Sequence, residues 1–288
     1  MAELILGTAT FNTGYGVANK GKIYAKEEAR EIILTAQLLG INEFDTAPAY
    51  GPAEEYLGEF LDMNLVPKIS SKISKENAKS AKLMLQSVRR TLFQTRTSKL
   101  KNLFLHDPEA LIGFGASETI AGLKELIALD LVERIGISVY SLESLLRAKE
   151  LLPELSIFQV PENICDRRML NSKELLDLRD GGDHFIVRSV FLQGLLLMPL
   201  DKIPPGLEAA RSSVSQLMVF SNSIGVTPLN LCLGYGQAIP WANGLVIGAA
   251  TASQLREIIE SSIQLPSGWD SEIDTLPEEV LDPRRWPK

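Results

Sequence analysis

The chain has 288 residues, of which 45% are hydrophobic and 23% are charged, and its formal net charge is −7. This composition is typical of a folded globular protein and excludes a disordered chain. The negative charge and the lack of a basic run that could follow a phosphate backbone argue against nucleic-acid binding. Residues 1–6 contain an acid and a short apolar run, and no stretch of about 18 apolar residues occurs, so we expect neither a signal peptide nor a membrane span.

The two cysteines, Cys165 and Cys232, form no CxxC motif and have no metal-ligand spacing. Two isolated cysteines suit a reducing compartment and argue against a disulfide scaffold. We therefore expect a cytoplasmic protein without a metal site. We also expect a monomer or a weak homo-oligomer.

Short apolar runs alternate with amphipathic segments along the whole chain. The runs predict strands at residues 4–8, 41–45, 67–72, 100–106, 132–138, 157–160, 185–189 and 245–247. Helical periodicity is found over residues 26–39, 53–61, 78–93, 168–178 and 253–263, in two segments within 205–239, and after the predicted caps Ser117 and Ser141. Thr227-Pro228 predicts the start of the second helix within 205–239.

The order of these elements indicates one closed barrel. Strand–helix units follow one another without a linker or a break in composition, which favours a single-domain α/β fold, a (β/α)8 TIM barrel spanning residues 1–288. An open doubly wound sheet would need a G-x-G-x-x-G turn, and neither Gly14-Tyr15-Gly16 nor Gly113-Phe114-Gly115 completes one. Residues 265–288 are expected to form a C-terminal tail that lies over the barrel as an extended lid or wrap.

Four chemically distinct side chains fall at the carboxyl ends of successive predicted strands. Asp45 ends the second strand, and Tyr50 lies on the loop beyond it. Lys72 ends the third strand and His106 the fourth. In a barrel these strand ends converge on one mouth, where active sites are built. We therefore expect an acid, a phenol, a lysine and an imidazole to meet there.

This set of side chains suits the protonation of a carbonyl oxygen. A phenol is a weak acid with a reference pKa of about 10, and a neighbouring ammonium favours its ionised form. An aspartate keeps the ammonium charged in a dry pocket, and an imidazole can hydrogen-bond the carbonyl oxygen. Because no side chain can deliver hydride, a nicotinamide cofactor is implied.

Each of these residues also has a purely structural interpretation. Asp45 and Tyr50 could be ordinary turn and surface residues, and Lys72 could be a surface lysine. His106 could be a hydrogen-bonded histidine at a strand end. The remaining histidine, His184, starts a predicted strand and is expected to be structural or exposed.

The same residues resemble those of the aldo-keto reductases, oxidoreductases built on a (β/α)8 barrel. The resemblance is carried, in chain order, by Leu6-Gly7-Thr8, Phe44-Asp45-Thr46-Ala47, Tyr50-Gly51, Glu54, Leu57-Gly58, Lys72, His106-Asp107-Pro108, Ile135-Gly136-Ile137-Ser138, Gln159, Gln193-Gly194-Leu195-Leu196 and Val246-Ile247-Gly248-Ala249. It spans nearly the whole chain. It implies NAD(P)H-dependent reduction of a small-molecule aldehyde or ketone to an alcohol.

The resemblance implies a role for each of the four side chains. Tyr50 would act as general acid in reduction and general base in oxidation. Lys72 would tune Tyr50, Asp45 would hold Lys72, and His106 would orient the carbonyl. Cofactor contacts are implied for Thr8, Ser138, Gln159, Arg188, Ser189, Phe191, Gln193, Gly194, Gly248, Thr251 and Gln254. Of these, Ser138 and Gln159 match positions that bind the nicotinamide carboxamide.

The chain departs from the family pattern at three places. Val139 stands where an asparagine often follows Ser138, and Arg188 stands where many members place an aromatic residue. A guanidinium can stack on a ring as an aromatic does, or it can form a salt bridge at the mouth. After the last strand, residues 248–255 contain no lysine or arginine to hold the 2′-phosphate of NADPH. NADPH is the cofactor the family implies, with NADH possible.

The substrate and two alternative functions stay open at this point. Phe11, Tyr15 and Phe114 lie on predicted mouth loops and indicate an apolar or sugar-stacking wall, with Phe11 expected to contact the substrate. A sugar-derived carbonyl is one candidate. The chain could instead be a catalytically weak nucleotide-sensing or regulatory barrel, as potassium-channel β-subunits are, or an aldolase that uses Lys72 as a Schiff-base amine.

Overall fold

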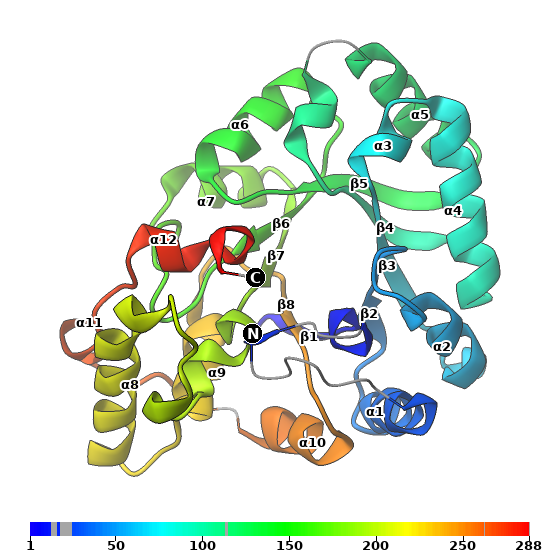
Figure 1. The fold of residues 1–288 in the computed structure, drawn as a ribbon. Helices are drawn as coiled ribbons and strands as arrows, with labels where there is room; N and C mark the ends of the chain where they lie inside the picture. Colours follow the sequence, from blue (N-terminus) through cyan, green and yellow to red (C-terminus); the bar gives the residue numbers. More distant parts are fainter. Residues whose placement is uncertain (13–15, 18–24, 113–114, 262, 288) are drawn as a thin grey trace.

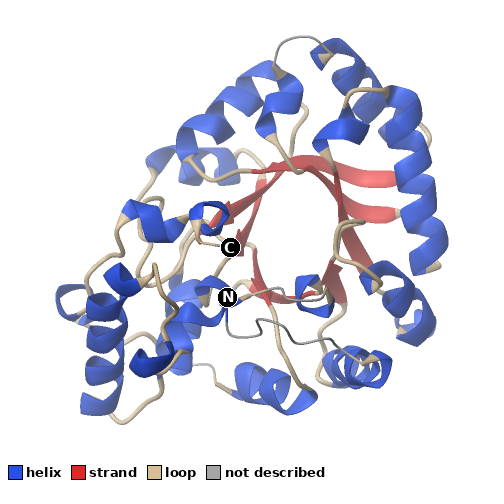
Figure 2. Ribbon diagram, in the orientation of Figure 1, coloured by secondary structure: helices blue, strands red, loops and turns tan. Residues whose placement is uncertain are grey.

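A computed structural model describes residues 1–12, 16–17, 25–112, 115–261 and 263–287. Its strands close into one parallel barrel in chain order, and Figures 1 and 2 show helices surrounding this ring. The strands are β1 (Glu3–Gly7), β2 (Glu43–Asp45), β3 (Lys68–Ile73), β4 (Leu100–Leu105), β5 (Val132–Ser138), β6 (Ile157–Pro161), β7 (His184–Arg188) and β8 (Gly244–Ile247). The predicted single-domain (β/α)8 barrel is confirmed.

The helices connect successive strands and form the outer layer. They are α1 (Lys26–Leu38), α2 (Ala53–Phe60), α3 (Lys75–Ala78), α4 (Ala81–Thr95), α5 (Ala116–Ala128), α6 (Leu142–Leu151), α7 (Lys173–Asp180), α8 (Arg211–Ser223), α9 (Pro228–Ala238), α10 (Ala252–Glu260), α11 (Trp269–Glu272) and α12 (Glu278–Leu281). Short 3-10 turns add η1 (Ala9–Phe11), η3 (Met63–Leu65), η4 (Pro108–Leu111), η5 (Leu192–Leu197), η6 (Leu200–Lys202), η7 (Glu208–Ala210) and η8 (Pro283–Arg285). The connection from β7 to β8 carries both α8 and α9.

Strand alternation separates an outer core from a barrel interior. Outward-facing side chains such as Leu6 and Phe44 join the large core beneath the helices. Alternate positions on five strands form a separate apolar cluster of Ile5, Phe104, Ile157, Ile186 and Val246. Lys72 pairs in register with Phe104, so its side chain shares a face with this cluster one strand away. The barrel interior is therefore packed below the mouth, as layered barrels require.

Two glycines of the family resemblance permit close packing. A Cβ at Gly136 would lie 1.8 Å from the carbonyl oxygen of Ile157 on the neighbouring strand. A Cβ at Gly58 would lie 2.0 Å from the carbonyl oxygen of Gln94, where α2 meets α4. Because neither oxygen belongs to a flexible side chain, any larger residue would force the backbone apart.

Two of the predicted helix starts are confirmed. Ser141 caps α6 by accepting a hydrogen bond from the backbone N–H of Ser144. Thr227 caps α9 in a capping box with Asn230, and Pro228 stands in the first turn.

Other predicted helix boundaries are wrong. The cap of α5 is Gly115, with φ of 101°, so Ser117 lies inside the helix. The helix predicted from residue 168 begins only after its cap Ser172. Before this cap, the Arg168 guanidinium donates two hydrogen bonds to the Asp166 carboxylate. The helix predicted over 78–93 begins at Ala81 as α4, after its cap Ser80, and Ala78 ends the short helix α3.

The C-terminal tail is folded and anchored, in contrast to the predicted extended segment. Its α11 places Trp269 against Tyr235 of α9, with ring centroids 5.2 Å apart. Arg167 donates a 2.6 Å hydrogen bond to the carbonyl oxygen of Ile273, and the N–H of Leu276 donates one of 2.8 Å to Cys165. These bonds bring η8, drawn in red in Figure 1, to the rim of the barrel.

Within the described residues, no single helix has the length and apolar composition to cross a membrane. The bent pair Glu208–Ser223 and Pro228–Ala238, with 97° between its helices, meets these criteria only when taken together.

Candidate active site

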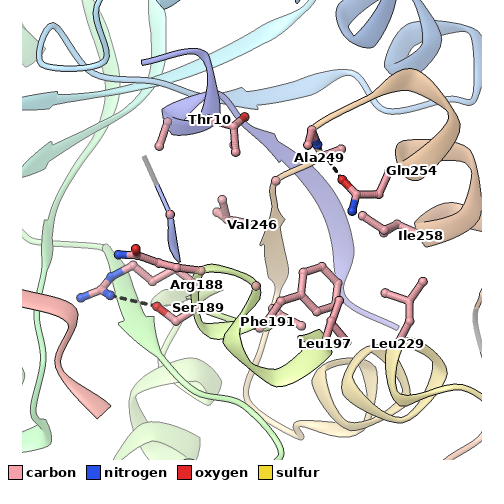
Figure 3. A pocket seen from close by; sticks show the side chains of 18 of the residues that line it. Thr10, Arg188, Ser189, Phe191, Leu197, Leu229, Val246, Ala249, Gln254 and Ile258 are labelled. Carbon is pink, nitrogen blue, oxygen red and sulfur yellow. Dashed lines mark hydrogen bonds between the residues drawn. The ribbon is translucent and has the colours of Figure 1, made fainter. Parts of the chain in front are cut away.

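A cavity of about 440 Å³ opens at the carboxyl ends of the strands. This volume lies in the range of small-molecule sites. The lining comprises Gly7, Ala9, Thr10, Gly16, Asp45, Tyr50, Tyr140, Gln159, Arg188, Ser189, Val190, Phe191, Gln193, Gly194, Leu197, Thr227, Pro228, Leu229, Val246, Gly248, Ala249, Ala250, Gln254, Glu257, Ile258 and Pro283. Strand ends, the loops after β7 and β8, the start of α9 and the tail thus share one cavity, part of which Figure 3 shows.

A buried ion pair lies beside this cavity. The Nζ of Lys72 is 2.6 Å from Oδ2 of Asp45, and their side chains are only 4% and 7% exposed. Lys72 also donates a 3.2 Å hydrogen bond to the backbone carbonyl of Thr46. Burial lowers the pKa of Lys72, but the charges of Asp45 and Tyr50 and hydrogen bonding to them outweigh it, so the pKa lies above its ordinary value. Lys72 is therefore an ammonium at neutral pH.

The aromatic ring of Tyr50 contacts the Lys72 ammonium. The Nζ of Lys72 lies 4.9 Å from the centroid of the Tyr50 ring. Tyr50 is half-buried and lines the cavity next to Asp45. The turn that carries it is held by a 2.9 Å bond from its N–H to the carbonyl of Ala47. Residues predicted from strand ends thus come together as one group.

His106 follows β4, is exposed and is not part of the cavity lining. Its N–H donates a 3.0 Å hydrogen bond to Ile73, which holds the backbone after the strand. Partial burial lowers the pKa of the imidazole, and the positive charges of Lys72 and Arg188 lower it further. His106 is therefore neutral at pH 7 and keeps one N–H donor. His184 lies at the opposite end of the barrel, at the start of β7, as expected.

Both oxygens of Asp45 are occupied. Gln159 donates a 2.8 Å hydrogen bond from Nε2 to Oδ1 of Asp45, and Lys72 donates one from Nζ to Oδ2. The Oε1 of Gln159 has no donor among the described residues, and the side chain lines the cavity. The backbone carbonyl of Asp45 accepts hydrogen bonds from the N–H and the hydroxyl of Thr8, at 2.9 and 3.0 Å. The aspartate is fixed from three sides.

A second buried carboxyl supports the strand that carries Lys72. Glu54, on α2, accepts 3.0 Å hydrogen bonds from Ser71 of β3 and Thr91 of α4. Burial raises the pKa of Glu54, which these hydrogen bonds partly offset. Glu54 joins α2 and α4 to the strand directly behind the mouth.

The loop after β7 adopts a strained backbone where it lines the cavity. Ser189, Leu192 and Gln193 have φ values of 65°, 45° and 55°, the left-handed region that non-glycine residues rarely enter. Such conformations persist where the surroundings impose them, and they concentrate at binding sites. Ser189 and Gln193, with Gly194 and Phe191, match predicted cofactor contacts and line the cavity.

Arg188 stacks on a tyrosine and forms no ion pair with the described residues. Its guanidinium carbon lies 4.0 Å from the ring centroid of Tyr140, and that of Arg284 in the tail lies 3.7 Å from the same centroid. Arg188 donates hydrogen bonds to the carbonyl of Val139 and the hydroxyl of Ser189. Tyr140 and the tail residue Pro283 both line the cavity, although no sequence motif had marked either of them.

Four predicted contacts lie outside the cavity lining. Thr8 and Ser138 are buried at strand ends, and Thr251 uses its hydroxyl to cap α10. Phe11 was expected to touch substrate, but it is only 3% exposed and its ring packs 6.5 Å from that of Tyr56. The contact of Phe11 with substrate therefore stays a prediction. Tyr15 and Phe114 lie outside the described residues.

Comparison with known proteins identifies the chain as an oxidoreductase that acts on carbonyl or alcohol groups. The profile of the aldo/keto reductase family matches residues 3–276. The chain belongs to the aldo-keto reductase family.

Individual relatives are distant. An L-galactose dehydrogenase of Arabidopsis thaliana is 26% identical over 95% of this chain and 92% of its own length. A thermostable aldo-keto reductase, solved with the inhibitor epalrestat, has a TM-score of 0.73 at 22% identity and covers 94% of this chain and 93% of its own. An aldo-keto reductase structure from Pseudomonas aeruginosa has a TM-score of 0.67 at 23% identity, over 90% and 88%. At these identities the solved structures support the fold alone.

Aldo-keto reductases use NAD(P)H, and the residues of this cavity fit such a cofactor. The hydroxyl of Thr10 is buried in the lining and has no hydrogen-bond partner among the described residues. The Oε1 of Gln159, which has no donor among the described residues, adds a hydrogen-bond acceptor. The strained backbone at Ser189 forms part of the cavity wall. An unsatisfied buried polar group is costly, and a polar ligand would relieve that cost.

Proposed function

We propose that this enzyme catalyses NAD(P)H-dependent reduction of a carbonyl to an alcohol, and the reverse oxidation, with Tyr50 as the proton donor and acceptor. The observation that carries the proposal is the buried Lys72–Asp45 pair in contact with the Tyr50 ring beside the cavity. A bound nicotinamide would supply the hydride. The protein's own part is to move one proton and to position the carbonyl.

In reduction, the Tyr50 hydroxyl would give its proton to the carbonyl oxygen. The Lys72 ammonium stabilises the phenolate that remains, because opposite charges in a pocket attract strongly. Asp45 keeps that ammonium charged and in place. In oxidation, the same phenolate would take the proton back from the alcohol.

His106 would orient the carbonyl. Its lowered pKa keeps the imidazole neutral, so it can donate one hydrogen bond to the oxygen without competing as an acid. The nicotinamide carboxamide would donate to Oε1 of Gln159, because Nε2 is committed to Asp45. The remaining cofactor contacts would come from Ser189, Gln193, Gly194 and Gly248.

For the substrate, we propose a sugar or a sugar-derived carbonyl. The relative named L-galactose dehydrogenase supports this class. The cavity also presents several hydrogen-bonding side chains, Thr10, Tyr140 and Arg188 among them, that could pair with hydroxyl groups. The cytoplasmic location and the monomeric or weakly oligomeric state remain predictions.

The aldolase alternative is disfavoured by the state of Lys72. An amine that attacks a carbonyl must be neutral, which requires a lowered pKa. The pKa of Lys72 is raised, and its Nζ is bonded to Asp45 and Thr46. The regulatory alternative would require dinucleotide binding without turnover.

The proposal is tested by binding and turnover together. Titration with NADH and NADPH is combined with a screen of sugars, aldehydes and ketones on wild type and on Tyr50→Phe. Reduction by wild type, with turnover lowered about 10²- to 10⁴-fold in Tyr50→Phe at unchanged dinucleotide affinity, supports the role. Dinucleotide binding without turnover on any carbonyl supports the regulatory barrel instead.

A further inference from the structure

We propose that this enzyme prefers NADH to NADPH and that Gln254 sets the preference. The inference rests on the proposed function, because it concerns the end of the same cavity that would hold the adenosine half of the cofactor. It departs from the NADPH that the family resemblance implies. Three features of the residues around the start of α10 carry it.

The first feature is the position of this helix. In (β/α)8 barrels, phosphate groups are held by the loops after the last two strands and by a helix N-terminus nearby. Here the loop after β8 runs from Gly248 to Thr251 and leads directly into α10. The cavity lining includes Gly248, Ala249 and Ala250 of this loop. A 2′-phosphate of the cofactor would therefore bind near this helix start.

The second feature is that two backbone N–H groups around this helix start are bonded to side chains of the same segment. The Oε1 of Gln254 accepts a 2.7 Å hydrogen bond from the backbone N–H of Ala250. The hydroxyl of Thr251 accepts one of 3.1 Å from the N–H of Gln254. Figure 3 shows Gln254 reaching back to the loop to make its bond. Two backbone donors that could have bound a phosphate are therefore already paired with neutral oxygens.

The third feature is the charge around this end of the cavity. Leu229, Ala249 and Ile258 are apolar, and the charged side chain beside them is the acid Glu257. Among the described lining residues, the one cation is Arg188, which belongs to β7 and stacks on Tyr140. Arg256 is exposed on α10 and is not part of the lining. At the end of the cavity near Gln254 (Figure 3), no described lining residue carries a positive charge that could neutralise a phosphomonoester.

The balance of these features favours a ribose diol over a phosphate. A phosphomonoester carries about −1.5 to −2 charge at pH 7, and it would be repelled by Glu257 without gaining a cation from the described lining at this end of the cavity. A neutral 2′-hydroxyl carries no such cost. The Nε2 of Gln254 makes no hydrogen bond to a described residue and could donate to that hydroxyl. Gln254 thus occupies one backbone donor that a phosphate could have used, and its Nε2 can donate to the diol.

The test is an equilibrium titration of the full-length enzyme with NADH and with NADPH, followed by cofactor fluorescence without substrate. Wild type is expected to bind NADH at least about 10-fold more tightly. Gln254→Arg removes the neutral oxygen from the Ala250 N–H and adds a cation, so the affinity ratio should move about 10-fold or more towards NADPH. Gln254→Lys, a second variant at the same position, should move it in the same direction.

A matched control separates position from charge. Ser253→Arg adds the same charge to the same helix turn at an exposed residue outside the lining, and it should leave the ratio within about 2-fold of wild type. Tighter binding of NADPH by wild type would overturn the inference and leave the oxidoreductase proposal intact. An unchanged ratio in both Gln254 variants would remove Gln254 as the determinant. Binding of neither dinucleotide would instead contradict the proposed function itself.

Discussion

Lys72 and Asp45 form an ion pair with 2.6 Å between Nζ and Oδ2, closed off from water at the base of the barrel mouth. The pair is surrounded by further partners: Gln159 binds the second carboxylate oxygen, and the Thr46 carbonyl binds the ammonium. A buried pair of this kind adds little net stability when intact, but loss of one partner leaves an uncompensated charge. The pair therefore serves to keep one lysine charged beside Tyr50.

Replacing the acid should destabilise the fold as well as stop catalysis. Asp45→Asn leaves the Lys72 ammonium buried without a counter-charge, which should cost about 3–5 kcal/mol of unfolding free energy. Urea unfolding followed by fluorescence measures this. The matched control is Asp130→Asn, which breaks the exposed Lys99–Asp130 pair and should cost less than about 1 kcal/mol. Equal losses in the two variants would contradict a special role for the buried pair.

Glu162 should make the stability fall as pH rises. It follows β6, is fully buried, and accepts a 2.6 Å hydrogen bond from the hydroxyl of Tyr235. Burial raises the pKa of Glu162 from 4.5 to about 8. Between these values the unfolded chain is ionised and the folded chain protonated, so this group lowers the unfolding free energy by about 1.4 kcal/mol per pH unit. Its stabilising contribution is complete below pH 4.5 and is lost above pH 8.

The contribution of Glu162 is isolated by comparison with Glu162→Gln. The amide keeps the shape and cannot ionise, so its unfolding free energy should lose less with pH across the interval from 5 to 8. Urea unfolding of both proteins at several pH values measures the difference in slope. Parallel curves would show that Glu162 is ionised in the folded protein throughout.

The tail should affect substrate binding more than turnover. Arg284 holds η8 to the mouth through the Tyr140 ring and pairs with Asp282. A cation–π contact of this kind contributes about 0.5–2 kcal/mol, so Arg284→Ala should raise KM about 2- to 30-fold with kcat nearly unchanged. Arg285→Ala, in the same turn, is the control. Unchanged KM together with unchanged tail proteolysis would contradict this role.

The strand ends were predictable and the loops were not. The positions of Asp45, Lys72 and His106 at the barrel mouth could be predicted because the ends of parallel strands converge whatever the loops do. The fold of the tail depends on contacts such as Arg167 to Ile273, which are 106 residues apart, and no local pattern encodes them. The same holds for Phe11, whose burial depends on Tyr56, and for Gln159, whose bond to Asp45 spans 114 residues. Local propensity fixes elements, but tertiary packing decides which side chains face the cavity.

The measurement that tests the central claim most directly is a single-turnover reaction with the reduced cofactor already bound. Wild type, Tyr50→Phe and the control Tyr56→Phe are mixed with saturating carbonyl, and oxidation of the cofactor is followed. We expect a rate about 10²- to 10⁴-fold lower in Tyr50→Phe and an unchanged rate in Tyr56→Phe, because the Lys72 ammonium lies over the ring of Tyr50 and not over that of Tyr56. A Tyr50→Phe rate within a few-fold of wild type would contradict it.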